Sequence, residues 1–492
     1  MSRFYITTSI MYANANPHIG FALELVQADA IARYRRMLGD EVYFLTGADE
    51  HGTKVMRSAQ QAGVPTQQFV DGIAGQMKEL CEKLEISNTD FIRTSDQKRH
   101  WPAVIKLWQA LEKAGDIYKK SYEGLYCVGH EAFLKPSELV GGLCPDHKTK
   151  PEPLKEENWF FRFSKYRDQV RELIITDGLR IVPERRKQEI LNLLEDAEDV
   201  SFSRPSNQLP WGIPVPGDDS QTMYVWADAL TNYLSGLGYG TDEAHMAFWP
   251  AQIHLVGKDI VRFHALLWPA MLMAAGLATP KQLYVHGFIT VNGQKMSKTI
   301  GNVINPVELL SKWGPEVVRY YFLRNLQSTD DSDLTLQNIA SSYNSDLANG
   351  LGNIVQRVAA LISKSDQKIV YRSDSGSTGG PLHEVFDDTA YHGAFNEFRL
   401  HDAIGHIWRG ISLTNAYLND RAPWKLEGTI RCQVLQTTVS ALMHLAGLLA
   451  PFMPSTTEQM LGTLGVTGTL SEAGDHILKP TLGHGLFPRI EK

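Results

Sequence analysis

Two short segments carry residues that could handle a polyphosphate. His18-Ile19-Gly20 lies between an expected strand at 4–10 and the start of an expected helix. A helix N-terminus offers free backbone N–H groups to phosphate, Gly20 allows close approach, and His18 can donate a proton. Lys295-Met296-Ser297-Lys298 follows another expected strand, in a loop between two glycines. Either segment alone is typical of an ordinary turn or a solvated surface. Together they predict that one imidazole and two ammonium groups meet on a triphosphate.

The elements around both segments predict a parallel, doubly wound sheet. Strand 4–10, a helix from residue 21 and a strand ending at Gly47 form a first block. Strand 252–256, helix 259–275 and strand 283–291 form a second. We interpret the charged, proline-containing stretch between them as an insertion. The remainder reads as helical, with helices expected at 338–364, 394–418 and 429–449 and a loop at 373–381.

Bulk properties narrow the class of protein. The chain has 492 residues, 43% of them hydrophobic, with a net charge of −7. This length predicts several domains, and the charge argues against a surface coated with basic patches for nucleic acid. Four cysteines cannot form a disulfide scaffold, and no secretory signal or apolar stretch of spanning length is evident. We therefore expect a cytoplasmic protein with no membrane contact.

The two phosphate-handling segments, HIGF and KMSKT, resemble the paired signatures of class I aminoacyl-tRNA synthetases. The resemblance implies that His18, Gly20, Lys295 and Lys298 bind ATP, with His18 and both lysines stabilising the transition state beside magnesium. The substrate carboxylate is already a nucleophile, so positioning and charge stabilisation are what the enzyme must supply. Two positions depart from the usual pattern. Thr299 keeps a hydroxyl, whereas Phe21 replaces a histidine, so activation is either slower or supported by another group.

A second set of residues suggests an apolar pocket. Trp226, Ala229 and Tyr233 share one helix face, which by itself is most often a core face. The surrounding block, GADEHGT and residues 254–272 are similar to the methionyl-tRNA synthetases. This resemblance implies that Asp49 holds the substrate ammonium and that Gly257 and Asp259 meet the ATP ribose. The residues implied to enclose the thioether are Ile10, Tyr12, Trp226, Ala229, Leu230, Tyr233, Ile260, Phe263, His264 and Trp268. Aromatic surfaces suit a polarisable sulfur, and His264 or Tyr12 could add a polar contact.

A metal site is expected within the insertion. Cys127 and His130 form one C-x2-H pair, and Cys144 and His147 form another after thirteen residues. This spacing is typical of a tetrahedral zinc site, and four protein ligands indicate a structural ion. The methionyl-tRNA synthetases carry such a knuckle here, usually with more cysteines.

The helical end of the chain contains residues suited to an RNA loop. Asn353 and Arg357 lie one helical turn apart, and Trp424 follows in RAPWK. Each has an ordinary explanation as a cap, a surface cation or a core residue, yet such side chains also hydrogen-bond and stack unpaired bases. The family resemblance implies that these three read the methionine anticodon.

The sequence thus predicts a split Rossmann catalytic domain (1–117 and 224–337), an insertion with a zinc knuckle (118–223) and an all-α anticodon-binding domain (338–492). The expected activity is formation of methionyl-adenylate from L-methionine and ATP, followed by transfer to tRNA(Met), both initiator and elongator. Cofactors would be magnesium and one structural zinc. We expect a monomer, because no C-terminal tRNA-binding domain follows. A non-catalytic tRNA-binding paralogue, which Phe21 alone favours, and a cysteine-type class I synthetase are the alternatives.

Overall fold

The computed structural model describes residues 1–128, 132–134, 136–146, 148–296, 302–365, 367–372, 380–466, 475–483 and 485–490. The chain divides into two units. The first consists of residues 1–28, 38–82 and 86–286, and the second of residues 29–37, 83–85 and 287–492. Helix α1 (Ile19–Met37) contributes its first half to the first unit and its second half to the second.

A seven-stranded parallel sheet forms the centre of the first unit. Its main path runs β3-β1-β13-β14-β8, and β2 and β4 also pair with β3. The central strands are buried along almost their whole length, as is usual when both faces of a sheet are covered. The strands are β1 (Arg3–Thr8), β2 (Met11–Tyr12), β3 (Glu41–Asp49), β4 (Asp90–Arg93), β8 (Arg180–Val182), β13 (Ile253–Gly257) and β14 (Gln282–His286).

The order of these strands creates one point where the topology changes direction. On one side of β1 lies β3, the next long strand along the chain, and on the other side lies β13, from a distant part of the sequence. In open α/β sheets, ligands bind outside the carboxyl ends of the strands at such a point. The doubly wound sheet predicted from the sequence is confirmed.

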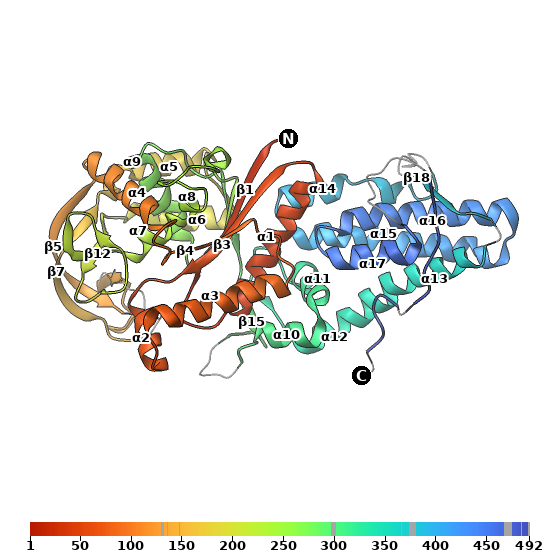
Figure 1. Ribbon diagram of the computed structural model, residues 1–492, viewed down its shortest axis with the longest axis horizontal. Coiled ribbons are helices and arrows are strands. Elements are labelled where there is room, and N and C mark those ends of the chain that lie inside the picture. Colours follow the sequence, from red (N-terminus) through yellow and green to blue (C-terminus); the bar gives the residue numbers. More distant parts are fainter. Residues whose placement is uncertain are drawn as a thin grey trace. The chain divides into compact units, whose positions relative to one another are not determined.

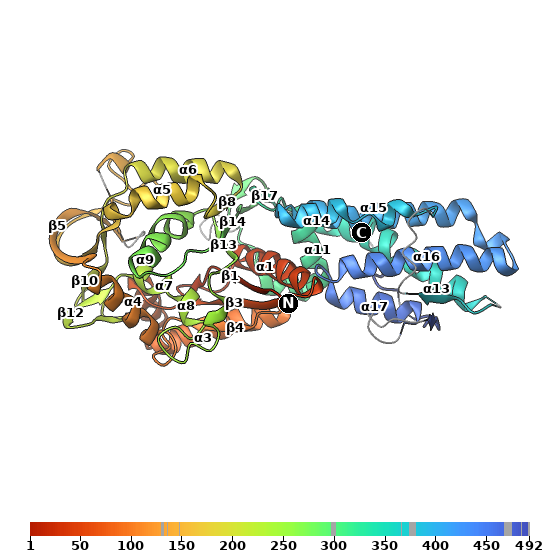
Figure 2. The same ribbon diagram turned by 90° about the horizontal axis from the view of Figure 1, so that it is seen from above.

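Helices of the first unit cover this sheet and share its core. Leu107, Val170 and Leu272 pack in one buried cluster with Val256 and Leu283 of the sheet. Figure 2 shows α5 and α6 side by side. The helices are α2 (Thr53–Ala62), α3 (Thr66–Lys83), α4 (Trp101–Lys113), α5 (Arg167–Ile175), α6 (Glu184–Glu195), α7 (Val225–Ala229), α8 (Asn232–Ser235) and α9 (Trp268–Ala274).

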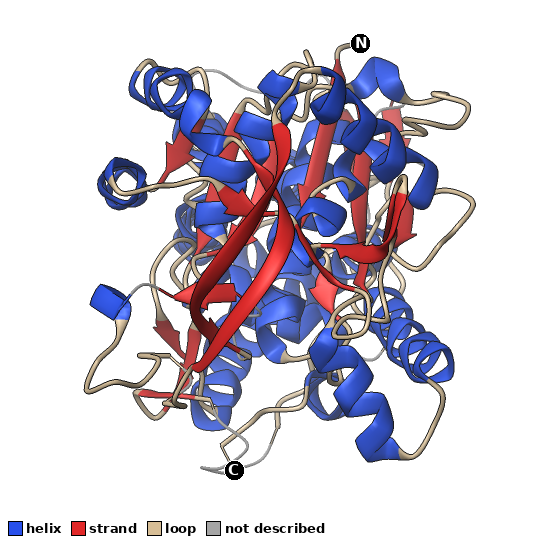
Figure 3. Cartoon of the chain, turned by 90° about the vertical axis from the view of Figure 1, so that its left-hand side faces the viewer, coloured by secondary structure: helices blue, strands red, loops and turns tan. Residues whose placement is uncertain are grey.

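The stretch expected to be an insertion contains two small antiparallel sheets. Its longest strands, β5 (Ile117–Cys127) and β7 (Glu152–Phe161), form a twisted ribbon at the front of Figure 3. They are joined by β6 (Ala132–Leu134) and β9 (Val200–Ser201). A three-stranded sheet follows, made of β10 (Ser203–Pro205), β11 (Pro214–Val215) and β12 (Asp218–Met223). Strand β8 lies within the same stretch of sequence but pairs with β14, so this region also supplies an edge strand of the parallel sheet.

Helices dominate the second unit. In Figure 1 helices α13, α15, α16 and α17 run side by side. The elements are β15 (Ile289–Val291), β16 (Gln294–Lys295), α10 (Pro306–Trp313), α11 (Pro315–Asn325), β17 (Ser332–Asp333), α12 (Leu336–Ser342), a π-helix (Tyr343–Gly352), α13 (Asn353–Ser363), β18 (Val370–Arg372), α14 (Thr389–Asn396), α15 (Leu400–Arg421), α16 (Gly428–Leu449), α17 (Pro454–Leu464) and β19 (Asp475–Ile477). Helix α16 is long and apolar enough to cross a bilayer by composition, but 61% of its most apolar window is buried in the bundle.

Two expected elements are divided in the structure. The strand expected at 283–291 is β14 and β15, separated at Gly287, where a side-chain Cβ would lie 2.2 Å from the backbone of Asp330. The helix expected at 394–418 is α14 and α15, separated by Phe398 with a φ of 55°. A helix cannot pass through a residue in the left-handed region, so the chain turns there. Most of the expected loop at 373–381 lies outside the described residues.

Candidate active site

His18 closes the turn that begins helix α1. Its carbonyl accepts hydrogen bonds from the backbone N–H groups of Phe21 and Ala22, and the Phe21 N–H also lies 3.1 Å from the ring Nδ1. Because an N–H can only donate, Nδ1 is the acceptor, and the proton of the neutral ring is on Nε2. The surrounding protein desolvates the ring and lowers its pKa, although Glu24 and Asp259 act in the opposite direction. His18 therefore presents a neutral N–H donor from an accessible ring.

Gly20 leaves room for this imidazole. A Cβ at position 20 would lie 3.1 Å from Nδ1 and 3.2 Å from Cε1 of His18. At such distances the contacted atoms must move, so a Cβ at position 20 would displace the His18 ring. The glycine thus permits the orientation in which His18 caps its own helix.

Glu24, which the sequence analysis did not single out, connects α1 to two strand ends. Its Oε1 accepts from the backbone N–H (2.5 Å) and the hydroxyl (2.6 Å) of Ser9, and its Oε2 lies 3.0 Å from Nε2 of His286. Ser9 follows β1 and His286 ends β14, on either side of β13. The carboxylate is only 4% exposed, so these contacts hold α1 against the carboxyl edge of the sheet. An acidic residue four residues after the HIG segment was the available sequence signal.

Gly257 and Asp259 reach the same edge from β13. A Cβ on Gly257 would lie 2.7 Å from Oδ1 of Asp259 and 3.5 Å from Nε2 of His286. The glycine ends its strand beside β14, while Asp259 is exposed. The structure therefore gathers His18, Gly257 and Asp259 around the point where the topology changes direction.

His264 and Tyr233 form a neutral hydrogen-bonded pair in the predicted pocket. The Tyr233 hydroxyl lies 2.7 Å from Nε2 of His264, and Nδ1 lies 3.1 Å from the carbonyl of Ile260. A carbonyl only accepts, so Nδ1 carries the proton and Nε2 accepts from the tyrosine. Burial lowers the pKa of His264 to about 4, so the ring is uncharged at neutral pH.

Aromatic rings surround that pair. Trp226 stacks on Phe263 with ring centroids 3.8 Å apart and an interplanar angle of 14°, and it meets His264 edge-on at 6.2 Å. Trp268 lies 6.0 Å from Tyr233 and donates its indole N–H to Nε2 of His254 at 3.3 Å. Such a cluster offers both faces and edges to an apolar ligand.

The other predicted pocket residues come from three places in the first unit. Tyr12 of β2 is the direct ladder partner of Asp49 of β3. Ile10 directly precedes β2. Ala229 and Leu230 are buried at the end of α7. Ile260 is half-buried in the turn before the π-helical segment.

The helix predicted to carry Trp226, Ala229 and Tyr233 is two short helices, α7 and α8. Thr231 donates its hydroxyl to the carbonyl of Ala227, and Asn232 donates its amide to that of Ala229. Side chains of this type compete with the helical ladder for carbonyl groups. The helix expected at 259–275 likewise contains a π-helical turn at Phe263–Leu267, where the His264 ring bonds to Ile260.

A buried carboxylate beside the pocket was also missed. Asp228, in α7, is 1% exposed, and its two oxygens lie 2.6 Å from Nδ1 of His51 and 2.7 Å from Nε2 of His100. The His100 Nδ1 lies 2.8 Å from the hydroxyl of Ser235 in α8. Burial acts to raise the pKa of Asp228, but the two histidines outweigh it and the pKa is lowered. Separations of 128 residues or more hide this cluster from a local reading of the sequence.

The second phosphate-handling segment belongs to the second unit. Lys295 ends β16, which pairs with β15, and its side chain lies outside the part of the chain that is described. Ser297 to Gly301, including Lys298, lie outside it entirely. Asp333 anchors the hairpin, because its Oδ1 accepts from the backbone N–H of Gly293 at 2.8 Å and from the hydroxyl of Thr290 at 2.9 Å.

Two of the four predicted metal ligands are described. Cys127 ends β5 and Cys144 follows the bridge between Val140 and Leu143, and both cysteines are buried in one small cluster with Leu134. Neither is in a disulfide. His130 and His147 lie outside the described residues. Among the residues that are described, no group of three or more histidine, cysteine, aspartate or glutamate side chains is arranged so that it could hold a metal ion.

The predicted RNA-reading residues are brought together in part. The Arg357 guanidinium lies 5.6 Å from the ring centre of Trp424, which is 47% exposed. It also donates to Asn415 at 3.1 Å and to Asn419 at 2.9 Å, both on α15. Asn353 is exposed at the start of α13. The sequence analysis missed the two asparagines, whose i, i+4 spacing was the available signal.

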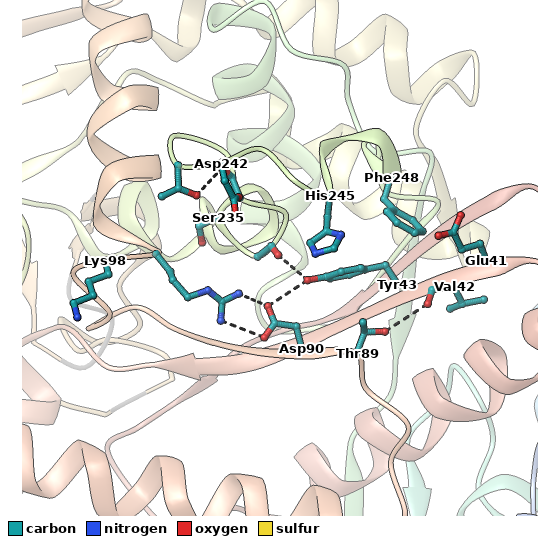
Figure 4. Close-up of a pocket in the computed structure, with 14 residues that line it drawn as sticks. Glu41, Val42, Tyr43, Thr89, Asp90, Lys98, Ser235, Asp242, His245 and Phe248 are labelled. Carbon is teal, nitrogen blue, oxygen red and sulfur yellow. Dashed lines mark hydrogen bonds and ion pairs between the residues drawn. The ribbon is translucent and has the colours of Figure 1, made fainter.

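A cavity of about 660 Å³ lies at the opposite end of the sheet, near the beginnings of β3 and β4. Figure 4 shows Tyr43, His245 and Phe248 along it, with the Tyr43 hydroxyl directed toward Asp90. None of the predicted catalytic, methionine-binding or metal-ligating residues lines this cavity.

Comparison with protein families identifies the class of this chain. The family model described as "tRNA synthetases class I (M)" matches residues 4–152 and 146–359. The methionine–tRNA ligase of Thermotoga maritima is 40% identical over 99% of this chain and 80% of the relative. That of Brucella suis is 38% identical over 98% of this chain and 95% of the relative.

Solved structures agree with these relatives. A Mycobacterium tuberculosis methionyl-tRNA synthetase in complex with methionyl-adenylate superposes with a TM-score of 0.92. It is 36% identical and covers 99% of this chain and all of that one.

Proposed function

The chain belongs to the class I tRNA synthetases of the methionine type, and from this we propose that His18, Lys295 and Lys298 are its catalytic residues. The enzyme activates L-methionine with ATP and charges tRNA(Met). In the first step the methionine carboxylate attacks the α-phosphorus, the bond to pyrophosphate breaks, and methionyl-adenylate forms. In the second step a hydroxyl of the terminal ribose of the tRNA attacks the carbonyl carbon and AMP leaves.

The observation that carries the proposal is the contact between the Phe21 N–H and Nδ1 of His18. With Nδ1 accepting from the Phe21 N–H, the neutral ring has its N–H donor on Nε2, at the topological position where an α/β sheet binds ligands. A donor fixed before the reaction stabilises charge on phosphate oxygens without reorganising. Lys295 and Lys298 supply positive charge to the departing pyrophosphate, and Gly20, Gly257 and Asp259 contact ATP.

Methionine is held by a carboxylate and an apolar enclosure. Asp49 pairs with the substrate ammonium at the carboxyl end of β3. The thioether lies among Ile10, Tyr12, Trp226, Ala229, Leu230, Tyr233, Ile260, Phe263, His264 and Trp268. The neutral Tyr233–His264 pair supports this role, because an uncharged polar group can face sulfur without the desolvation cost of a buried charge.

Two metals belong to this proposal. Magnesium, when bound, neutralises charge on the triphosphate. One structural zinc is held by Cys127, His130, Cys144 and His147. The burial of both cysteine side chains in one cluster supports the zinc site, since thiolates are preferred zinc ligands.

The tRNA anticodon is read by Asn353, Arg357 and Trp424. The exposed Trp424 ring offers a surface on which a base can stack, and Arg357 is held beside it by two asparagines. We further propose that the enzyme is a cytoplasmic monomer and that it accepts both initiator and elongator tRNA(Met).

Methionine-dependent exchange of pyrophosphate into ATP tests the activation step. Purified protein should catalyse exchange with L-methionine and not with L-cysteine. Absence of exchange with methionine, from protein that still melts cooperatively, would overturn the proposal.

A further inference from the structure

The buried cluster of Asp228, His51 and His100 lies outside the residues assigned above. Asp228 is two residues after Trp226 and directly before Ala229, so it shares a helix with the wall of the methionine pocket. His51 is two residues after Asp49, the proposed partner of the substrate ammonium. His100 precedes α4, and its other nitrogen meets Ser235 of α8.

Hydrogen-bond chemistry defines the direction of every contact in this cluster. The histidines hold the pKa of Asp228 low despite burial, which opposes ionisation, so its carboxylate accepts on both oxygens. Nδ1 of His51 and Nε2 of His100 must then carry protons. The contacts are 2.6 and 2.7 Å long, at or just below the short end of the range of charge-assisted hydrogen bonds.

The loop that carries Asp49 is held in place by contacts of the next two residues, Glu50 and His51. Glu50 is fully buried, pairs with Arg93 at 2.6 Å and accepts from the indole N–H of Trp211 through its backbone carbonyl. His51 contacts α7 through its hydrogen bond to Asp228. A single carboxylate, that of Asp228, therefore joins the proposed ammonium-binding loop to the aromatic wall.

We propose that Asp228 is a positioning residue for methionine, which sets the distance between Asp49 and the pocket wall formed by α7. His51 and His100 act through Asp228, and none of the three touches the reacting atoms. This inference rests on the proposed methionine site. According to this inference, the cluster affects the affinity for methionine, and it affects neither the affinity for ATP nor the chemical step.

Variants that differ only in a hydrogen-bond donor give the sharpest test. Asn at position 51 keeps an N–H donor near the position of Nδ1, and Gln at position 100 keeps one near the position of Nε2. Leu at either position fills a similar volume but has no side-chain donor. We expect His51→Leu, His100→Leu and Asp228→Ala to raise the KM for methionine, and so to lower kcat/KM, by about 10- to 100-fold, the effect of losing a hydrogen bond to a buried charged group. The loss should lie in the KM for methionine, with the KM for ATP unchanged. His51→Asn and His100→Gln should recover most of it.

The readouts separate positioning from damage to the fold. Active-site titration by the adenylate burst counts correctly folded enzyme, and a merely structural role would lower that count without changing the KM for methionine. His245→Leu is the control, because His245 is an exposed histidine of the same unit whose ring packs against Tyr43. Equal KM values for the Asn and Leu variants at position 51 would overturn the inference, even if the position 100 variants fail to fold. Wild-type enzyme without exchange activity would instead remove the proposed function.

Discussion

Nδ1 of His18 lies 3.1 Å from the backbone nitrogen of Phe21. Phe21, where this chain departs from the usual first signature, thus supports the proposed catalytic histidine through its main chain, which any residue at position 21 would provide. The Phe21 side chain is 3% exposed and belongs to the core. The remaining proton of His18 is on Nε2, free to face a phosphate.

Removing the imidazole tests its share of the transition state. His18→Ala should lower kcat for methionine-dependent exchange by about 10²- to 10³-fold, or roughly 3–4 kcal/mol, the usual effect of losing one preorganised donor. The KM for methionine should change little. A variant that exchanges pyrophosphate at the wild-type rate would show that another group carries this role.

Gly20→Ala should separate activity from stability. Alanine is favoured over glycine in a helix by about 1 kcal/mol, so the melting temperature should hold or rise. The new Cβ would crowd the His18 ring at 3.1 Å, and kcat for exchange should fall. Unchanged kcat would mean that the ring adjusts without losing its contact to substrate.

Phe21→His restores the common signature and should not help this enzyme. An imidazole at this buried position costs about 1–3 kcal/mol when it lacks a partner, so the melting temperature should fall. The exchange rate per active site should not rise. A faster and equally stable variant would show that the second imidazole can reach the substrate in this chain.

His264 makes stability depend on pH. Folding depresses its pKa from 6.5 to about 4, so the unfolded chain binds a proton that the folded one does not between these values. The stabilising contribution is complete above pH 6.5 and is lost as the pH falls toward 4, by about 3 kcal/mol in total. The melting temperature of wild type relative to His264→Gln should therefore drop between pH 7.5 and pH 4.5. A constant difference across that range would contradict the neutral assignment.

Arg357 should matter for tRNA and not for adenylate formation. Arg357→Ala should lower kcat/KM for tRNA charging by about 10- to 100-fold, because one specific base contact contributes roughly 1–3 kcal/mol. Asn415→Ala should give a smaller loss, since Asn419 still holds the guanidinium. Both variants should keep wild-type pyrophosphate exchange, and a parallel loss of exchange would place the effect outside RNA recognition.

The local sequence pattern was enough to predict the parallel sheet and the strand ends near His18. Strand, loop and helix around His18 were predicted from β-branched and apolar residues, and the parallel order followed from their alternation. The breaks were harder, because they are caused by particular contacts that residue periodicity does not show. Gly287 divides a strand since Asp330 approaches it, and the π-helical turn forms where the His264 ring bonds to Ile260.

The polar supports of the site were beyond a local reading. Glu24 contacts His286, which is 262 residues away in the sequence, and Asp228 contacts His51 and His100, which are 177 and 128 residues away. Each residue alone has the appearance of a surface charge or an ordinary core histidine. Only their burial and shared partners in the folded chain reveal their role.

A crystal structure with a non-hydrolysable methionyl-adenylate analogue would test the central claim most directly. The account predicts Nε2 of His18 within hydrogen-bonding distance of the phosphate, the Asp49 carboxylate on the ammonium, and the thioether between Trp226 and the Tyr233–His264 pair. An analogue bound with its phosphate away from His18, or with its side chain outside that aromatic enclosure, would contradict it.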